Sequence, residues 1–122
     1  MTDNFFSDSE LRDLRETTLE ELRELFEGIE NLLERFNTRK NGKEDLKGIA
    51  DLYHTVTGTA GIVGLKDISE LASEAEALAG SEDMEKEEAV SKLGDATKRF
   101  NSLLLRLEGG EPDNSSREME NE

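Results

Sequence analysis

The 122-residue chain contains no cysteine and no tryptophan, and only one proline and one histidine. Without cysteine it forms no disulfide and no thiolate metal site, which is compatible with a reducing compartment. The one proline, Pro112, lies near the end of the sequence, so nothing before it is barred from being helical. No apolar run approaches the roughly 20 residues of a membrane span. The acidic start MTDNFFSDSE lacks the basic and apolar regions of a signal peptide. We therefore expect a cytoplasmic protein without a membrane segment.

Basic residues are also scarce, because 15 Lys and Arg stand against 30 Asp and Glu, which gives a formal net charge of −15. This charge repels nucleic acids and anionic membranes, so we expect neither as a partner. The sequence lacks a phosphate-binding loop, a kinase glycine-rich loop and an acid–histidine cluster with metal-ligand spacing. We expect no cofactor, no metal and no ATP-dependent kinase activity in this chain. We also expect a monomer.

Four segments have apolar residues at three- and four-residue steps, which is typical of amphipathic helices, and none alternates like a strand. They span about residues 9–36, 44–63, 66–79 and 84–107. In the first, the residues expected to face the core are Leu14, Thr18, Leu22, Leu25, Ile29, Leu32 and Phe36. Short connections between four such helices predict an all-α fold, the antiparallel four-helix bundle.

We assign residues 1–108 to this one domain, with Phe5 and Phe6 as a short apolar lid on the bundle. Residues 109–122 combine glycine, proline and charge without a core pattern. Such a composition is typical of a disordered acidic tail or of the start of a linker.

The stretch LYHTVTGTAGIVG, residues 52–64, holds the only histidine and three glycines within the second predicted helix and the turn after it. At about 100° per residue, His54 lies about 140° from the centre of the apolar stripe and faces solvent. Gly58 and Gly61 share its face, and Lys47 precedes it there by about 10 Å. Each interior glycine costs a helix about 1 kcal/mol. Their presence indicates a cleared surface where another macromolecule can approach the ring.

Structural explanations for the same residues stay open at this point. A lone exposed histidine on a helix commonly has no function, and glycines inside a helix can serve close helix–helix packing. Gly64 is expected in the turn before the third helix, where its role is structural. The pattern by itself leaves undecided whether His54 is reactive.

The segment HTVTGTAGIVGL resembles the signature of histidine phosphotransfer (HPt) domains. After the reactive histidine that signature has a hydrophobic residue at +2, lysine at +3, glycine at +4, small residues at +5 and +6, and glycine at +10. The matching residues here are His54, Val56, Gly58, Thr59, Ala60 and Gly64. Thr57 stands at the lysine position, which is a departure. The following ISELASEAEAL is similar to the next helix of the N-terminal phosphotransfer domain of chemotaxis-type histidine kinases.

The resemblance implies a phosphocarrier in a two-component system or phosphorelay. Its histidine would accept a phosphoryl group on Nε2 from a kinase core or from the aspartate of a receiver domain, and then pass it on. In the family a glutamate one helix away hydrogen-bonds this histidine, and the matching position here is Glu76. The same helix of the family often carries a second histidine, and this chain has Ser73 at that position. The implied partners are a response-regulator receiver domain and a histidine kinase, with Mg²⁺ in the partner's active site.

Several functions remain open. The first class is a phosphotransfer protein, with the N-terminal substrate domain of a chemotaxis-type histidine kinase as its close variant. Because Thr57 replaces the lysine, a degenerate module that only docks a receiver is a second class. A structural bundle with an incidental histidine is a third. Phosphate on His54 that is labile in acid and stable in base would separate the first class from the others.

Overall fold

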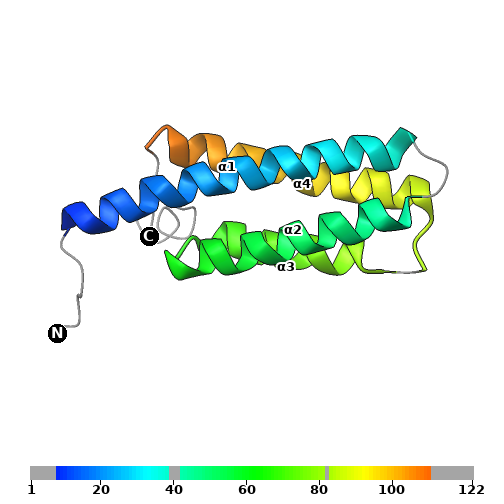
Figure 1. The fold of residues 1–122 in the computed structure, drawn as a ribbon, viewed down its shortest axis with the longest axis horizontal. Coiled ribbons are helices and arrows are strands. Elements are labelled where there is room, and N and C mark those ends of the chain that lie inside the picture. Colours follow the sequence, from blue (N-terminus) through cyan, green and yellow to red (C-terminus); the bar gives the residue numbers. More distant parts are fainter. Residues whose placement is uncertain (1–7, 39–41, 82, 111–122) are drawn as a thin grey trace, which may run out of the picture.

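The structure, a computed structural model, describes residues 8–38, 42–81 and 83–110, which form four α-helices joined by short connections (Figure 1). The helices are α1 (Asp8–Thr38), α2 (Lys43–Ile62), α3 (Lys66–Ala79) and α4 (Lys86–Glu108). Successive helices run in opposite directions, and α4 packs back against α1. This confirms the predicted four-helix bundle, with helix ends at most two residues from those predicted. The proposed lid, Phe5 and Phe6, and residues 111–122 of the proposed tail lie outside the described residues.

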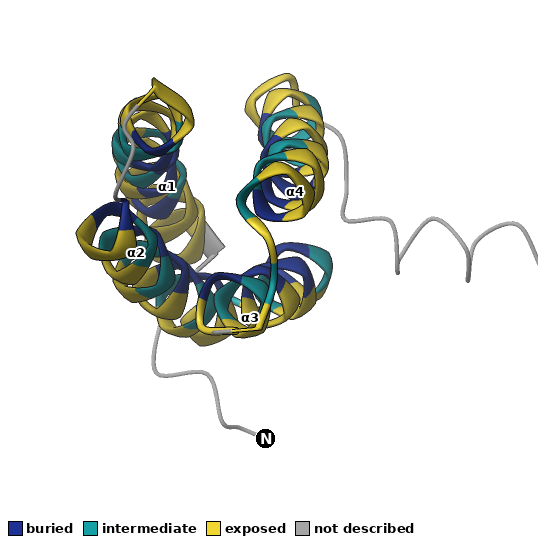
Figure 2. Ribbon diagram, turned by 90° about the vertical axis from the view of Figure 1, so that its right-hand side faces the viewer, coloured by how far each residue is buried: buried dark blue, intermediate teal, exposed yellow. Residues whose placement is uncertain are grey.

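The buried faces of the four helices turn toward one another around the bundle axis (Figure 2). At its centre the ring of Phe26 meets Phe100 edge-on, with centroids 5.7 Å apart, and Tyr53 lies 6.1 Å from Phe100. Edge-to-face aromatic pairs stabilise a core beyond the area that they bury. Fully or almost fully buried aliphatic residues complete it: Leu22, Ile29, Ile49, Val56, Leu65, Ile68, Leu93 and Leu104. No helix of the described ranges is long and apolar enough to cross a membrane.

The first helix extends past the end of the second. Gly28 lies against Leu52, because a Cβ at Gly28 would be 3.3 Å from Leu52 Cδ1. In this antiparallel register the last residue of α2, Ile62, is level with Thr18 on α1. Leu14 lies one turn further out and remains 37% exposed, so its prediction as a core residue is wrong. The periodic pattern continues along the chain, but a turn is buried only where a neighbouring helix reaches as far.

The second helix ends in a turn that needs a glycine. Gly64 has a φ of 76°, which L side chains rarely adopt. Its N–H donates to the carbonyl of Gly61 at 3.2 Å, and the N–H of Leu65 donates to the carbonyl of Ala60 at 2.9 Å. This pair of bonds, with Leu65 and Ala60 both buried, is the Schellman arrangement of a helix C-terminus. The predicted structural role of Gly64 is confirmed.

Candidate functional site

His54 lies in the middle of α2, on the outward face that the helical wheel assigns to it. Its side chain is 77% exposed. The preceding residue, Tyr53, and Val56 two positions later are both fully buried. The helix backbone beneath the imidazole is therefore held by the core, whereas the ring itself stands in solvent.

Tyr53 fastens α2 to α4 directly beside His54. Its hydroxyl lies 2.9 Å from the hydroxyl oxygen of Thr97 on α4, and both residues are buried. Burial raises the pKa of Tyr53 from its ordinary 10.0 to about 12, because the apolar interior disfavours the phenolate, and the bond to Thr97 opposes that rise. The neutral phenol is thus the form that fits the fold.

Glu76 on α3 reaches the histidine across the α2–α3 interface. Its Oε2 lies 3.1 Å from Nδ1 of His54, and its side chain is half-buried. An ionised carboxylate only accepts hydrogen bonds, so a neutral His54 in this contact carries its proton on Nδ1 and donates it. The contact selects one tautomer of the ring.

That tautomer leaves the other ring nitrogen, Nε2, with its lone pair. In the described part of the chain no group hydrogen-bonds Nε2 of His54. A positioned neutral imidazole nitrogen is a competent nucleophile. When it attacks, positive charge develops on the ring, and the carboxylate of Glu76 is placed to stabilise it, as an orienting acid does in a catalytic triad.

Thr57 lies half-buried on the α3 side of α2, and its hydroxyl is engaged within its own helix. It donates to the carbonyl of Tyr53 at 3.0 Å. The carbonyl of Thr57 in turn accepts a 3.1 Å hydrogen bond from the hydroxyl of Ser69 on α3. Ser69 and Thr97, which both tie α2 to a neighbouring helix next to the site, were not predicted. No local signal marks them, because their roles depend on which helices become neighbours.

The glycines of α2 divide into two kinds. A Cβ at Gly48 would lie 2.9 Å from Leu32 Cδ1, so packing against α1 accounts for this glycine. A Cβ at Gly58 would have no atom within 4 Å, and one at Gly61 would make a single ordinary contact at 3.7 Å. Packing therefore requires neither Gly58 nor Gly61, and at these two exposed positions α2 presents bare backbone.

The absence of a side chain at Gly58 has only a limited effect on the space around the ring of His54. Because a Cβ there would have no neighbour within 4 Å, a methyl group would not touch the ring of His54. Only a side chain longer than that of alanine would crowd the imidazole from this position. What the glycine keeps open is the space above the helix next to the ring.

Lys47 is not brought to the histidine. It lines a cavity of about 610 Å³ at the end of the bundle where α2 begins. Lys43 and Lys86 line the same cavity, together with apolar residues that include Phe36 and Met84. Lys47, His54 and Glu76 all lie within the described ranges, and Lys47 makes no hydrogen bond or ion pair with either of the other two.

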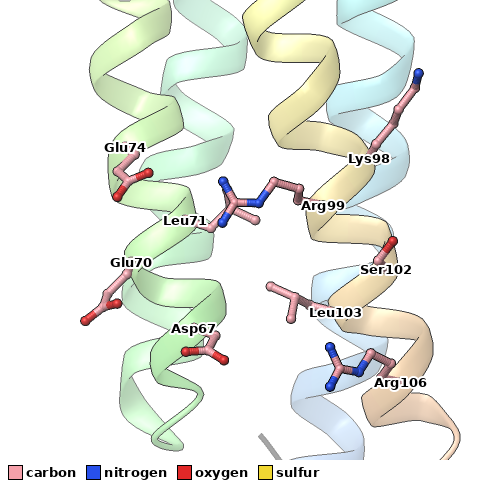
Figure 3. Close-up of a pocket in the computed structure, with 9 residues that line it drawn as sticks. All are labelled: Asp67, Glu70, Leu71, Glu74, Lys98, Arg99, Ser102, Leu103 and Arg106. Atoms are coloured by element: carbon pink, nitrogen blue, oxygen red, sulfur yellow. The ribbon is translucent and has the colours of Figure 1, made fainter. Parts of the chain in front are cut away.

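A second hollow, of about 500 Å³, lies between α3 and α4 (Figure 3). Acidic residues line its α3 side and basic residues its α4 side: Asp67, Glu70 and Glu74 against Lys98, Arg99 and Arg106. It includes none of the predicted site residues. Over the described residues no three His, Asp or Glu side chains are grouped so as to hold a metal ion. The candidate site is thus a surface centred on His54 rather than a pocket.

Comparison with models of protein families matches residues 13–115 to the Hpt domain. The matched range includes most of α1 and all of α2, α3 and α4, and so both His54 and Glu76. Comparisons with curated proteins and with solved structures gave no match.

Proposed function

Because the chain belongs to the Hpt domain family, whose members carry out histidine phosphotransfer in phosphorelay signalling, we propose that His54 is its phosphoryl-accepting residue. The observation that supports this most directly is the pairing of the chain's one histidine, 77% exposed, with a carboxylate 3.1 Å from its Nδ1. This contact leaves the outer nitrogen, Nε2, free to react.

The proposed step moves one phosphoryl group between two nucleophiles. The lone pair of His54 Nε2 attacks phosphorus, an N–P bond forms, and the P–O bond to the donor breaks. The leaving group is ADP when the donor is ATP in a kinase core. It is a free aspartate carboxylate when the donor is a phosphorylated receiver domain. The proton on Nδ1 stays in the bond to Glu76 throughout. The reverse step passes the group to an aspartate.

In this proposal Glu76 is a positioning residue. It holds the tautomer with Nε2 unprotonated and stabilises the cationic ring as the N–P bond forms. Phosphoryl transfer depends mainly on positioning and on charge stabilisation by metal ions and cationic groups. We assign those to the partner, with Mg²⁺ in the active site of the kinase core or the receiver domain. The proposed partners are accordingly a histidine kinase, a response-regulator receiver domain, or both.

A second candidate is a module that docks a receiver domain without carrying phosphate. Thr57 favours it, because a neutral hydroxyl already bonded to the carbonyl of Tyr53 replaces the lysine of the family signature. A charge-assisted hydrogen bond is roughly twice as strong as a neutral one. In this case the receiver would bind the chain, but His54 would carry no phosphate.

The test uses the whole chain with three donors: a histidine kinase core with ATP labelled at the γ-phosphate, a receiver domain phosphorylated on aspartate, and phosphoramidate. We expect label that is lost in acid, kept in base and mapped to His54. The matched control is His54→Gln, which should take no label. It should keep the helical circular dichroism and the melting temperature of the wild type, because exposed side chains contribute little to stability. Label on His54→Gln, or no label from any donor, would overturn the proposal.

A further inference from the structure

The stretch of sequence that contains His54 differs in charge from the rest of the chain. Charged residues make up 37% of the chain, yet residues 52–65 contain no Asp, Glu, Lys or Arg. This run covers the second half of α2 and the turn into α3. It begins after Asp51 and ends before Lys66. We call this run, residues 52–65, the neutral strip of a protein whose net charge is −15. The charged group that contacts its histidine, Glu76, comes from α3.

The strip also carries the most exposed large apolar side chain of the described residues. Ile62, the last residue of α2, is 81% exposed. It follows His54 by eight residues, which is about 12 Å along the helix axis at about 1.5 Å per residue. Gly58 lies midway, one turn from each, and contributes no side chain. Core packing does not account for an isoleucine at this exposed position, since the core of that turn is supplied by Ala60 and Leu65.

We propose that His54, Gly58, Gly61 and Ile62 form the docking surface for a receiver domain, with Ile62 as its apolar anchor. The proposal rests on the proposed function of His54 and adds where the partner binds. An aspartyl phosphate and the carboxylates that hold its Mg²⁺ make the partner's active site anionic. Like charges across an interface oppose association, so such a site approaches most easily along a stretch of helix that adds no negative charge of its own.

The bare backbone and the isoleucine have complementary parts in this contact. Gly58 and Gly61 let the partner's surface come close to α2, so that an aspartate can reach Nε2 of His54. Ile62 then inserts into an apolar depression beside the partner's aspartate and removes its own apolar surface from water. An exposed apolar residue close to a reactive group, on a stretch of helix that carries no charged side chain, is typical of the centre of an interface.

Two other surfaces are rivals for the partner, and each predicts different variants to be defective. One is the lysine-lined cavity that includes Lys43 and Lys47. The other is the hollow between α3 and α4, whose acidic and basic sides face each other (Figure 3). Neither contains a residue of the neutral strip. Only the strip is continuous with His54, so a partner bound there meets the reacting nitrogen directly.

The experiment compares Ile62→Ala with Leu105→Ala in the full chain. Leu105 is the matched control, because it is 56% exposed but lies on α4, away from the strip. Each protein is first phosphorylated with phosphoramidate. This donor breaks its P–N bond, releases ammonia and needs no docking surface. Transfer is then followed to an isolated receiver domain, chosen from a panel as the one that takes phosphate fastest from the wild type.

For Ile62→Ala we expect an unchanged rate with phosphoramidate and a roughly tenfold higher KM for the receiver domain, with kcat nearly unchanged. Ile62→Glu should raise KM further, because it places a negative charge in the strip. Leu105→Ala should match the wild type in both reactions. All three should melt at the wild-type temperature, because the replaced side chains are exposed.

The outcomes separate this inference from the function on which it rests. A wild-type KM for Ile62→Ala, or an equal rise in KM for Leu105→Ala, would overturn the docking surface and leave the phosphotransfer function standing. A defect for Lys47→Ala with none for Ile62→Ala would move the docking surface to the lysine-lined cavity. If His54 took no phosphate from phosphoramidate or any protein donor, the proposed function and this inference would both fail.

Discussion

The hydroxyl groups of Tyr53 and Thr97 lie 2.9 Å apart in the buried interior, one residue along the helix from the exposed ring of His54. His54, the reactive residue that we propose, thus makes no core contact that would limit access to its ring. Its neighbour in the chain, Tyr53, holds α2 against α4. This separation lets α2 present a side chain to a partner without losing its position in the bundle.

The first prediction concerns alkaline pH. A tyrosine in the unfolded chain ionises near 10.0, whereas burial raises the pKa of Tyr53 to about 12. A raised pKa in the folded state contributes stability that is fully present below pH 10 and is lost as the pH rises toward 12. The loss should reach about 3 kcal/mol, at about 1.4 kcal/mol per pKa unit. Tyr53 is the only tyrosine and there is no tryptophan. Absorbance of tyrosinate at alkaline pH therefore reports this residue alone and should rise together with unfolding.

The control for that titration is Tyr53→Phe. It should destabilise the protein by about 1 kcal/mol at neutral pH, because it removes a buried hydrogen bond and leaves Thr97 without its partner. It should also unfold at a higher pH than expected from its neutral-pH stability, since no phenol ionises. A Tyr53 that titrates near pH 10 in the folded protein would contradict its burial.

The second prediction tests the contact between His54 and Glu76. Glu76→Ala should slow phosphorylation of His54 by about 10- to 100-fold, the range of general acid–base contributions. Glu76→Gln keeps an acceptor oxygen but not the charge, so it should fall between the wild type and the alanine variant. The nitrogen NMR shifts of the imidazole at a fixed pH give the tautomer directly. The proton should lie on Nδ1 in the wild type and should shift toward Nε2 in Glu76→Ala. Identical tautomer populations in the two proteins would mean that this carboxylate does not orient the ring.

The third prediction concerns Gly58. Gly58→Ala should raise the free energy of unfolding by about 0.5–1 kcal/mol, because alanine is the better helix former and its methyl group meets no atom within 4 Å. Gly48→Ala should gain less, because its methyl group would press on Leu32. Thermal or urea unfolding measures both. Gly58→Leu should hinder phosphoryl transfer from protein donors, whereas phosphoramidate should still label it at a similar rate. Wild-type transfer by the leucine variant would show that the open space at Gly58 has no role in partner approach.

The fourth prediction concerns Thr57, the departure from the family signature. Thr57→Lys should raise the rate of phosphorylation by up to about tenfold, or 1.4 kcal/mol, because a cation one turn from His54 helps to neutralise the incoming group. The wild type should nevertheless be clearly active. Single-turnover rates measure the effect, with Thr57→Met as an uncharged control of similar length. An equal gain for methionine would exclude charge as the cause. Phosphate on the lysine variant alone would favour the docking module.

Much of the fold could be predicted because its signals are local. The spacing of apolar residues gave the four helices and the bundle, since a helix of 3.6 residues per turn must cover one apolar face. The same wheel placed His54 on the outside of α2, and the turn chemistry of Gly64 marked the end of that helix. Glu76 was singled out only through the family resemblance. By residue pattern alone it is one acid among the 30 acidic residues of the chain.

Only the tertiary structure decided the features that depend on which helices are neighbours and how far each extends. The pairing of Glu76 with His54 joins residues 22 positions apart. It exists because α3 folds back along α2. Gly48 and Gly58 look alike in the sequence, but one meets α1 and the other meets solvent. Leu14 continues the apolar stripe of α1 past the end of α2 and stays exposed. Periodicity specifies the face of a helix, whereas contact and burial require a second helix at the same level.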